Sequence, residues 1–351
     1  MGRKLTFAEA VNEAMFQAME MDKSVICYGL GVDDPKGVYS TTLGLQEKFG
    51  KERVFDIPSS ENAMTGVAIG AGLRGFRSVM THQRLDFFLL AMDQLVNGAA
   101  KWHYMFGGQH NVPITIRLIV GRGWGQGPTH SQSLQSWFAH IPGLKVVMPA
   151  LTKDAKGLLL SSIFDDNPVI FLEPRWLHNQ QGEVPEGDYR TPLGMANVIK
   201  QGSEISVISM SYMTVEALHV VDYLDKHDIS CELIDLRTVA PIDWDMIFQS
   251  VKKTGRILVL DTGSTTGSIA GEIIARVAIE LFDDLHCAPR RIGLPDFPSP
   301  TSPALTKGFY PDAVSIAEQI VTMLNVDVNC GELSDITMPH DVPGDWFKGP
   351  F

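Results

Sequence analysis

The chain has 351 residues, of which 44% are hydrophobic and 20% charged, and its 29 Lys+Arg and 41 Asp+Glu give a formal net charge of −12. This composition is typical of a globular protein with enough chain for about two domains. It disfavours nucleic-acid binding, because neutralising phosphates requires clustered Lys and Arg, and no such cluster is present. The longest apolar runs are far shorter than the roughly 20 residues that span a bilayer, so no membrane span is predicted.

The first half of the chain alternates short apolar runs with helical patterns. Thr6-Phe7-Ala8-Glu9 has the form of a capping box, which predicts a helix that begins at Thr6. Strands are predicted at 24–30, 53–57, 77–81, 114–120, 144–147 and 169–172, and further helices at 40–49, 61–73, 86–104, 131–140 and 153–164. Such alternation predicts a parallel sheet that is covered on both faces.

Residues 179–192 are rich in Gly, Pro, Glu and Gln and have no apolar period, which is typical of an exposed connector. We therefore predict a first domain over 1–178, a linker over 179–192 and a second domain over 193–325. In the second domain, strands are predicted at 205–210, 231–236, 257–260 and 291–294, and helices at 214–225, 244–251, 268–281 and 312–324. The predicted fold class is α/β, with two parallel-sheet domains.

The ends and the cysteines add little chemistry. A tail over 326–351 carries Trp346, Phe347 and Phe351, which either wrap onto a neighbouring surface or belong to a frayed terminus. The four cysteines are far apart in sequence and form no CxxC pair, so neither a zinc knuckle nor a disulfide framework is predicted. We expect reduced thiols and a cytoplasmic location.

A first candidate segment is Ile57-Pro58-Ser59-Ser60-Glu61-Asn62. A strand runs into a turn, and Glu61 falls at the start of the next helix. An acidic residue in the first turn complements the helix dipole, so a purely structural role explains Glu61 as well as a functional one does. The helix continues with small residues, and Gly66 and Gly70 lie one turn apart on the same face. We therefore expect a partner to pack closely against this helix.

The second candidate is the glycine-rich stretch 121–132, which reads GRGWGQGPTHSQ and follows the strand predicted at 114–120. Its glycines predict a mobile or tightly curved loop that brings His130 to the carboxyl end of a parallel sheet, where ligands bind in such folds. The pattern is not a GxGxxG that leads into a helix, so a dinucleotide site is poorly supported. His130 is a candidate for acid/base or oxyanion-binding chemistry.

The third candidate is the segment 83–88, which reads QRLDFF. Phe87 and Phe88 either fill the core or form a cofactor face, and Asp86 is a plausible helix cap. The chain has neither a GxxxxGK[ST] phosphate loop nor a GxSxG nucleophile elbow, which argues against P-loop hydrolysis and ordinary α/β-hydrolase chemistry.

Taken together, these segments resemble the beta subunit of the thiamine-diphosphate-dependent decarboxylase component of 2-oxo-acid dehydrogenase complexes, of the pyruvate, branched-chain and acetoin types. The resemblance runs from about Lys4 to Asn325. It is carried by DIPSSE at 56–61, AMDQLVNGAAK at 91–101, HSQ at 130–132, HIPGLKVV at 140–147, DAKGLL at 154–159 and DLRTVAP at 235–241. GPTH at 127–130 is also similar to a transketolase loop. The resemblance implies a transketolase-like pyrimidine-binding domain followed by a transketolase C-terminal-like domain.

The resemblance also implies roles for individual residues. Glu61 matches the glutamate that hydrogen-bonds the aminopyrimidine ring of thiamine diphosphate, and Phe87 matches the aromatic residue that stacks on this ring. His130 matches the active-site histidine associated with the 2-oxo acid and with acyl transfer. Beta subunits of the family often hold a monovalent cation, and the matching positions in this chain are Ile114, Ser162, Asp165 and Asn167. The resemblance therefore implies a K⁺ site at these residues.

The chain lacks the Gly-Asp-Gly motif ending in Asn-Asn that anchors the diphosphate and Mg²⁺ in the family's other subunit. This absence implies a separate alpha subunit, an α2β2 heterotetramer, and a cofactor that lies at the seam between alpha and beta. The resemblance further implies a lipoyl group on a carrier protein as the acceptor, and a lipoyl acyltransferase core as a further partner.

Departures from the family leave the substrate open. The chain reads Gly29-Leu30-Gly31-Val32 where the family usually has an acidic pair, and Leu30 cannot carry a proton. Arg84 replaces an apolar or aromatic residue, His82 lies two positions before it, and Leu90 stands where pyruvate enzymes have glutamine. Because a guanidinium fork suits carboxylate or phosphate, Arg84 with His82 either binds an anionic group of the substrate or belongs to a structural ion pair.

Two alternative functions remain open from the sequence. A split transketolase or a carboligating synthase would use the same cofactor, and GPTH at 127–130 and the loss of the acidic pair favour it. A non-catalytic assembly or regulatory subunit would keep only the fold. The presence of Glu61, Phe87 and His130 argues against this last alternative.

Overall fold

The computed structural model describes residues 3–334. Within this range the chain packs as two compact units, the first formed by residues up to 121 together with 137–193, and the second by 122–136 together with 194 onward. Both units contain mainly parallel sheets, which confirms the predicted α/β class. Residues 122–136, which carry the glycine-rich stretch, fold with the second unit.

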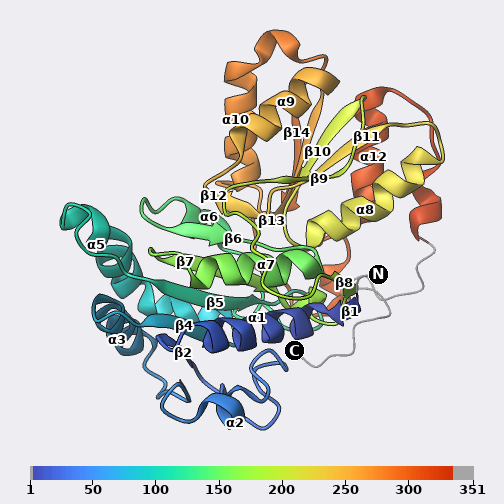
Figure 1. The fold of residues 1–351 in the computed structure, drawn as a ribbon. Helices are drawn as coiled ribbons and strands as arrows, with labels where there is room; N and C mark the ends of the chain where they lie inside the picture. The colour runs from blue at the N-terminus through green and yellow to red at the C-terminus, as the bar shows by residue number, and fades with distance from the viewer. Residues whose placement is uncertain (1–2, 335–351) are drawn as a thin grey trace. The chain divides into compact units, whose positions relative to one another are not determined.

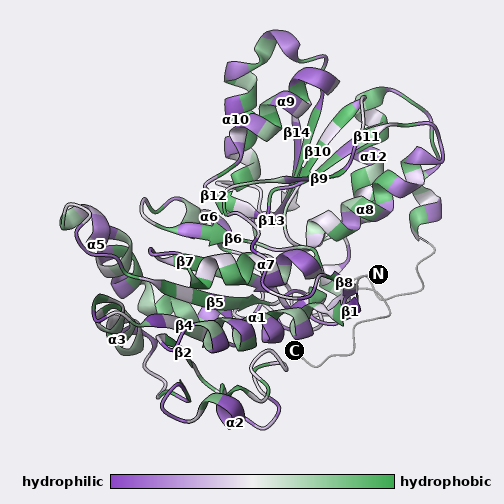
Figure 2. Ribbon diagram, viewed as in Figure 1, coloured by the Kyte–Doolittle hydropathy of each residue, from purple (hydrophilic) through white to green (hydrophobic). Residues whose placement is uncertain are grey.

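The sheet of the first unit is parallel (Figure 1). Its strands lie in the order β6 (Lys145–Val147), β7 (Val169–Pro174), β5 (Ile114–Val120), β4 (Arg77–His82), β2 (Val25–Tyr28) and β3 (Val54–Phe55). β5 is buried along its whole length, and Figure 2 shows it as mainly hydrophobic. This burial is expected of a parallel strand that is covered on both faces.

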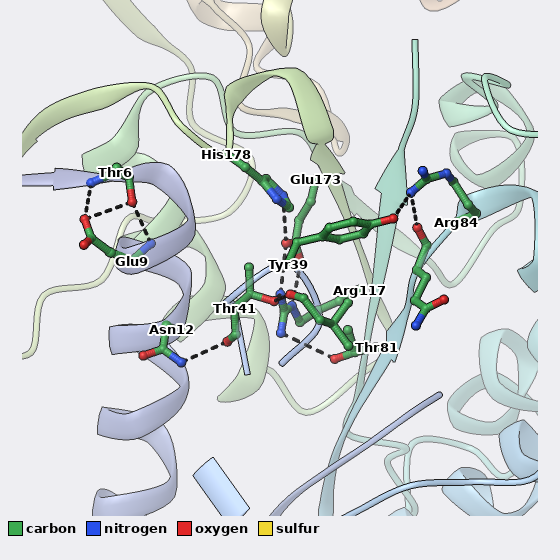
Figure 3. Close-up of polar contacts among 12 residues, drawn as sticks. Thr6, Glu9, Asn12, Tyr39, Thr41, Thr81, Arg84, Arg117, Glu173 and His178 are labelled. Carbon is green, nitrogen blue, oxygen red and sulfur yellow. Dashed lines mark hydrogen bonds and ion pairs between the residues drawn. The ribbon is translucent and has the colours of Figure 1, made fainter. Parts of the chain in front are cut away.

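Helix α1 (Phe7–Met21) begins as the sequence predicts. Thr6 Oγ1 accepts a hydrogen bond from the Glu9 backbone N–H at 3.2 Å, and the Glu9 carboxylate accepts one from the Thr6 N–H at 2.7 Å (Figure 3). This is the predicted capping box, which satisfies two backbone donors that the helix itself cannot. α1 packs along α7 (Thr152–Ile163).

Two predicted helices of the first unit differ from the structure. The helix predicted at 40–49 is confined to α2 (Leu45–Phe49), because Ser40 and Gly44 adopt positive φ angles of 66° and 74° that a right-handed helix excludes. The helix predicted at 86–104 is broken into α4 (Leu85–Phe88), a 3₁₀ turn η1 (Leu89–Ala91), a π-helical stretch η2 (Gln94–Ala99) and α5 (Ala100–Met105).

Packing explains the glycine within this broken segment. A Cβ at Gly98 would lie 2.7 Å from Ile69 Cδ1, so glycine lets η2 approach α3 (Glu61–Leu73) closely. π-helical stretches are often found at functional sites.

The predicted connector at 179–192 contains a strand that the sequence does not reveal. β8 (Gln181–Val184) pairs antiparallel with β1 (Arg3–Thr6). The two strands form a separate ribbon whose residues are mostly half-buried or exposed, so an apolar period is absent. η3 (Arg175–Leu177) and α6 (Gln135–Ala139) are the other short elements of this half.

The sheet of the second unit has the order β14 (Arg290–Leu294), β13 (Ile257–Ser264), β10 (Ile205–Ser209), β11 (Cys231–Asp235) and β9 (Asn197–Lys200). β9 is antiparallel to β11, and the other pairs are parallel. Figure 1 shows α9 (Trp244–Thr254) and α10 (Ile269–Glu280) on one side of this sheet and α8 (Tyr212–Asp225) and α12 (Ala313–Leu324) on the other. Both faces of the sheet are therefore covered, as predicted.

The remaining short elements of the second half are β12 (Thr238–Ala240), η4 (Phe282–Asp284), α11 (Pro303–Thr306) and η5 (Cys330–Ser334). The tail is anchored at Asn329, whose carbonyl accepts a hydrogen bond from the Tyr223 hydroxyl at 2.6 Å. Trp346, Phe347 and Phe351, which we considered as a wrapping segment, lie outside the described residues.

The core of the first unit contains a fully buried ion pair between Arg117 of β5 and Glu173 of β7 (Figure 3). Arg117 Nε and Nη2 donate to the two carboxylate oxygens at 2.5 and 2.9 Å. Burial by itself would raise the pKa of Glu173, but the charge of Arg117, the hydrogen bonds from Arg117 and the His178 ring, whose Nε2 lies 3.7 Å from the carboxylate, lower this pKa to about 2. Glu173 is therefore ionised in the core.

We expect Glu173→Gln to lower the free energy of unfolding by about 3–5 kcal/mol, because it leaves the Arg117 charge buried without its counter-ion. Lys48→Met is the control, since it removes the exposed Lys48–Glu20 pair and should cost less than about 1 kcal/mol. Urea unfolding at pH 7 measures both. Equal losses for the two variants would contradict this assignment.

Candidate active site

Glu61 is the first residue of α3 and follows the turn after β3. The residue is only 7% exposed. Its backbone carbonyl accepts a hydrogen bond from Thr65 Oγ1 at 2.9 Å. Across residues 3–334, no side chain or backbone group hydrogen-bonds or pairs with the Glu61 carboxylate. It is therefore a nearly buried acceptor that can serve a donor from outside the chain.

Phe87 and Phe88 differ in exposure, which distinguishes the core residue from the candidate cofactor-facing residue. Phe88 is fully buried and packs edge-on against the His82 ring, with 4.9 Å between centroids. Phe87 is 38% exposed. Val67 on α3 and Leu90 on η1, which packs against α3, are 55% and 70% exposed. Phe88 is thus a core residue, whereas Phe87 belongs to an exposed apolar surface that suits a flat ring or a partner chain.

The Gly66 and Gly70 positions differ in what faces them. A Cβ at Gly66 would lie 3.3 Å from Gln94 Oε1, whereas a Cβ at Gly70 would meet nothing within 4 Å. Gly70 therefore leaves an open patch of backbone surface on α3, and closure of a partner on this helix stays a prediction.

His130 belongs to the second unit, whereas Glu61 and Phe87 belong to the first. Its Nδ1 lies 3.1 Å from Thr129 Oγ1, and the side chain is half-buried. Gly127 has a φ of +67°, and a Cβ there would lie 2.5 Å from Thr301 Oγ1. Glycine is thus required three residues before His130 for both backbone conformation and space.

Both ends of the glycine-rich stretch are fixed within the second unit. The Arg122 guanidinium lies 4.4 Å from the Tyr212 ring centroid and 4.5 Å from that of Tyr310. At the other end, Gln135 Nε2 donates to the buried Asp261 carboxylate at 2.6 Å. The segment that carries His130 is therefore an anchored loop.

A cavity of about 450 Å³ in the second unit is lined by residues that follow His130, such as Ser131, and by the loops after β13 and β14. Asp296 is a charged residue of this lining, which contains neither Lys nor Arg. Hydrogen bonds from Thr266 lower the pKa of Asp296. A negatively charged cavity does not suit a diphosphate, which binds to cations and oriented N–H groups.

Two comparisons of sequence place these features in a family. Residues 3–180 match the pyrimidine binding domain of transketolase, and residues 194–316 match the transketolase C-terminal domain. The chain is 42% identical over 327 residues to the beta subunit of acetoin:2,6-dichlorophenolindophenol oxidoreductase of Cupriavidus necator, a match that covers 90% of this chain and 96% of that protein.

The chain belongs to the family of transketolase-like beta subunits. It is also 37% identical to the pyruvate dehydrogenase E1 component subunit beta of Rickettsia felis and 38% identical to the 2-oxoisovalerate dehydrogenase subunit beta of Bacillus subtilis. These matches cover 90% and 89% of this chain and 97% of each relative. They confirm the resemblance on which the predicted site residues depend.

A solved structure titled split gene transketolase, inactive beta4 tetramer, has the same fold, with a TM-score of 0.73. The match covers 92% of this chain and 99% of that one. At 19% identity it supports the fold alone.

In this transketolase-like beta subunit, His82 and Arg84 lie at the end of β4, and both are 4% exposed. Burial lowers the pKa of His82 to about 4, so its imidazole is neutral at pH 7. Arg84 Nη1 donates to the Tyr39 hydroxyl and to the Gln83 carbonyl, both at 2.7 Å (Figure 3). Of the two residues predicted to meet an anion, only Arg84 can bring a positive charge, and this role stays a prediction.

Of the predicted cation positions, Ser162 and Asn167 are linked to Asp165 by hydrogen bonds. Arg77 Nη1 donates to the Asp165 carbonyl at 2.8 Å, and the Lys145 ammonium pairs with the Asp165 carboxylate. Asn167 Oδ1 is buried, and no group within residues 3–334 forms a hydrogen bond with it. Ser162 donates to a helix carbonyl, and Ile114 begins β5. Asp165 thus already interacts with the cationic side chains of Arg77 and Lys145, and K⁺ binding stays a prediction.

The following statements on metal clusters, membrane spans and cysteines hold for residues 3–334. There, no three His, Cys, Asp or Glu side chains gather as a metal ion would require. None of the helices in this range is long and apolar enough to cross a membrane. Cys27, Cys231, Cys287 and Cys330 are all free thiols.

Neither the Arg117–Glu173 pair nor the position of Tyr39 was predicted from the sequence. A signal for the pair was available, because each charge interrupts a strand that is otherwise apolar and a buried charge requires a partner. Nothing in the local sequence marks Tyr39, since its position depends on contacts with distant segments.

The buried histidines predict a dependence of stability on pH. Burial lowers the pKa values of His82 and His178 to about 4, below their ordinary value of 6.5. The unfolded chain therefore binds more protons than the folded chain as the pH falls from 6.5 towards 4, and the free energy of unfolding decreases over this window. Each histidine contributes a loss of about 2 kcal/mol between pH 7 and pH 5.

Urea unfolding at pH 7 and pH 5 checks this expectation in the wild type and in His82→Gln. The variant should lose less stability than the wild type over this interval. An equal loss in both proteins would show that His82 is not the titrating group.

Proposed function

We propose that the chain is the beta subunit of a heteromeric thiamine-diphosphate-dependent enzyme that decarboxylates a 2-oxo acid and transfers the acyl or aldehyde unit, with a lipoyl carrier protein as acceptor. The observation that carries this proposal is the similarity of 37–42% identity, over about nine-tenths of the chain, to beta subunits named for acetoin, pyruvate and 2-oxoisovalerate. The nearly buried acceptor Glu61 and the exposed ring of Phe87 in the same unit support it.

The residues of the chain fit the pyrimidine end of the cofactor. Glu61 would accept a hydrogen bond from a pyrimidine ring nitrogen, and its low exposure would keep water from competing for that proton. Phe87 would orient the ring by stacking on it. His130 would hold or move a proton near the oxo acid. When bound, thiamine diphosphate supplies the carbon nucleophile and the electron sink for decarboxylation.

The diphosphate end requires another chain. The sequence has no Gly-Asp-Gly motif, and the cavity beside the His130 segment is lined without Lys or Arg. We therefore propose an alpha subunit that holds the diphosphate and Mg²⁺ in an α2β2 assembly, with the apolar surface at Val67 and Leu90 facing a partner. We also propose that a K⁺ ion binds near Asn167, that a lipoyl acyltransferase core is a further partner, and that the enzyme is cytoplasmic.

A carboligating synthase or split transketolase is the second candidate, because Leu30 replaces the acidic residue that the family usually has. Such an enzyme would start from the same bound cofactor and differ in its acceptor. A product assay with the assembled enzyme separates lipoyl transfer from carboligation. Leu30→Glu should increase lipoyl transfer only if the first candidate is correct.

Cofactor binding should require both subunits. We expect calorimetric titration with thiamine diphosphate and Mg²⁺ to show binding to the co-purified alpha–beta pair and no binding to this chain alone, because the chain offers only the pyrimidine side of the site. Tight binding of the whole cofactor by the lone chain would refute this arrangement.

Glu61→Gln should reduce turnover of the assembled enzyme by at least about 100-fold, because a neutral amide cannot hold the proton that the pyrimidine exchanges. Assembly and thermal stability should be retained. Glu47→Gln, at an exposed position of α2, is the matched control and should keep wild-type turnover. If Glu61→Gln also turned over at the wild-type rate, Glu61 would have no part in the reaction.

A further inference from the structure

We propose that Tyr39 is a positioning residue, which holds the Arg84–Phe88 segment in place and thereby fixes the ring of Phe87 for the cofactor. This inference rests on the proposed function, because it concerns the residue that would stack on the pyrimidine. The stacking role is assigned to Phe87 and not to Tyr39. Tyr39 acts through Arg84, three residues before Phe87.

The backbone at Tyr39 is held in an uncommon conformation. Tyr39 and the following Ser40 have φ angles of 47° and 66°, a region that bulky side chains rarely adopt. Such a conformation persists only where the surroundings fix it. Here Thr41 Oγ1 donates to the Val38 carbonyl at 2.7 Å and accepts from Arg117 Nη2 at 2.8 Å. The loop that carries Tyr39 is therefore tied to the buried ion pair of the core.

Two buried guanidinium groups meet the Tyr39 side chain. Arg84 donates to its hydroxyl at 2.7 Å, and the Arg84 guanidinium carbon lies 5.5 Å from the ring centroid. The guanidinium carbon of Arg175 lies 4.6 Å from the same centroid. Both arginines are at most 5% exposed. The ring face attracts both cations, which would otherwise repel each other at this buried place.

The same ion pair also fixes the strand that leads to Arg84. Arg117 Nη1 lies 3.4 Å from Thr81 Oγ1, near the end of β4, while Nη2 holds Thr41 (Figure 3). The loop with Thr41 and strand β4 thus both contact the Arg117 guanidinium, and the Tyr39–Arg84 hydrogen bond is a second link between these two segments. Figure 3 shows this bond at the far end of the network from Glu173 and His178.

The Tyr39–Arg84 hydrogen bond bears on the orientation of α4 and therefore of the Phe87 ring. α4 starts immediately after Arg84, so the direction of this short helix depends on how Arg84 is held. A stacking residue contributes to cofactor binding only while its ring is fixed in the right plane, and small misplacements of such groups are costly. Loss of the Tyr39 hydroxyl should therefore weaken cofactor binding through Phe87, the residue to which the stacking role is assigned.

The test uses the complex with the alpha subunit and titrates thiamine diphosphate with Mg²⁺ by calorimetry. We expect Tyr39→Phe, which keeps the ring, to raise the Kd of the cofactor about tenfold. The matched control is Tyr189→Phe, which also removes one tyrosine hydroxyl of the first unit, here a bond to the Lys153 carbonyl at 2.6 Å. The control should leave the Kd unchanged. A Kd for Tyr39→Phe equal to that of the control would overturn the inference.

A double-mutant cycle asks whether the effect passes through Arg84. If it does, adding Tyr39→Phe to Arg84→Met should change the Kd no further, whereas independent effects would multiply. Arg84→Lys, which keeps a cation near the hydroxyl, should restore part of the affinity. A multiplied effect in the double variant would overturn the assignment of Tyr39 as a residue that acts on Arg84.

Other outcomes separate this inference from its alternatives. A purely structural role would lower the thermal midpoint of the Tyr39→Phe complex and leave the cofactor Kd as in the wild type. A substrate-binding role of Arg84 would raise the KM for the 2-oxo acid in Arg84→Lys at an unchanged cofactor Kd. Either result would refute the positioning role. If the wild-type complex bound no cofactor, the proposed function itself would fail.

Discussion

The buried pair of Arg117 and Glu173 is the interaction on which the carboxyl edge of the first sheet depends. A charge pair with no exposure is costly to bury, and it is stable only when further hydrogen bonds satisfy the guanidinium. Thr41 and Thr81 supply these bonds, and they come from a loop and a strand that the Tyr39–Arg84 hydrogen bond also joins. One electrostatic requirement thereby sets the positions of the segments that lead to Tyr39 and to Arg84.

The candidate site residues are divided between the two units. Glu61 and Phe87 belong to the first unit, and His130 is carried by a loop that the second unit anchors through Arg122 and Gln135. Glu61 combines low exposure with a carboxylate that has no partner in the described part of the chain, which is unusual for a residue with only a structural function. An acceptor of this kind fits a ring that is delivered from another subunit.

Much of the fold follows from local sequence, and the exceptions have physical causes. The helix at Glu61–Leu73 and the strand at Ile114–Val120 are predicted with their observed bounds, since their signals lie within the segments themselves. The π-helical stretch at Gln94–Ala99 is not predictable, because it results from packing against α3. β8 was missed because its partner β1 lies almost the whole first domain away in sequence. Local patterns singled out Glu61, Phe87 and His130 as candidates and the resemblance gave them their roles, whereas the Tyr39 position depends on contacts that no local pattern records.

A structure of the assembled alpha–beta complex with thiamine diphosphate would test the central claim most directly, through the distance between the Glu61 carboxylate and the pyrimidine ring. We expect a distance of about 2.6–3.2 Å between the Glu61 carboxylate and a pyrimidine ring nitrogen, with the Phe87 ring on the face of the pyrimidine. A Glu61 carboxylate turned into solvent, or a cofactor whose pyrimidine lies away from α3, would contradict it.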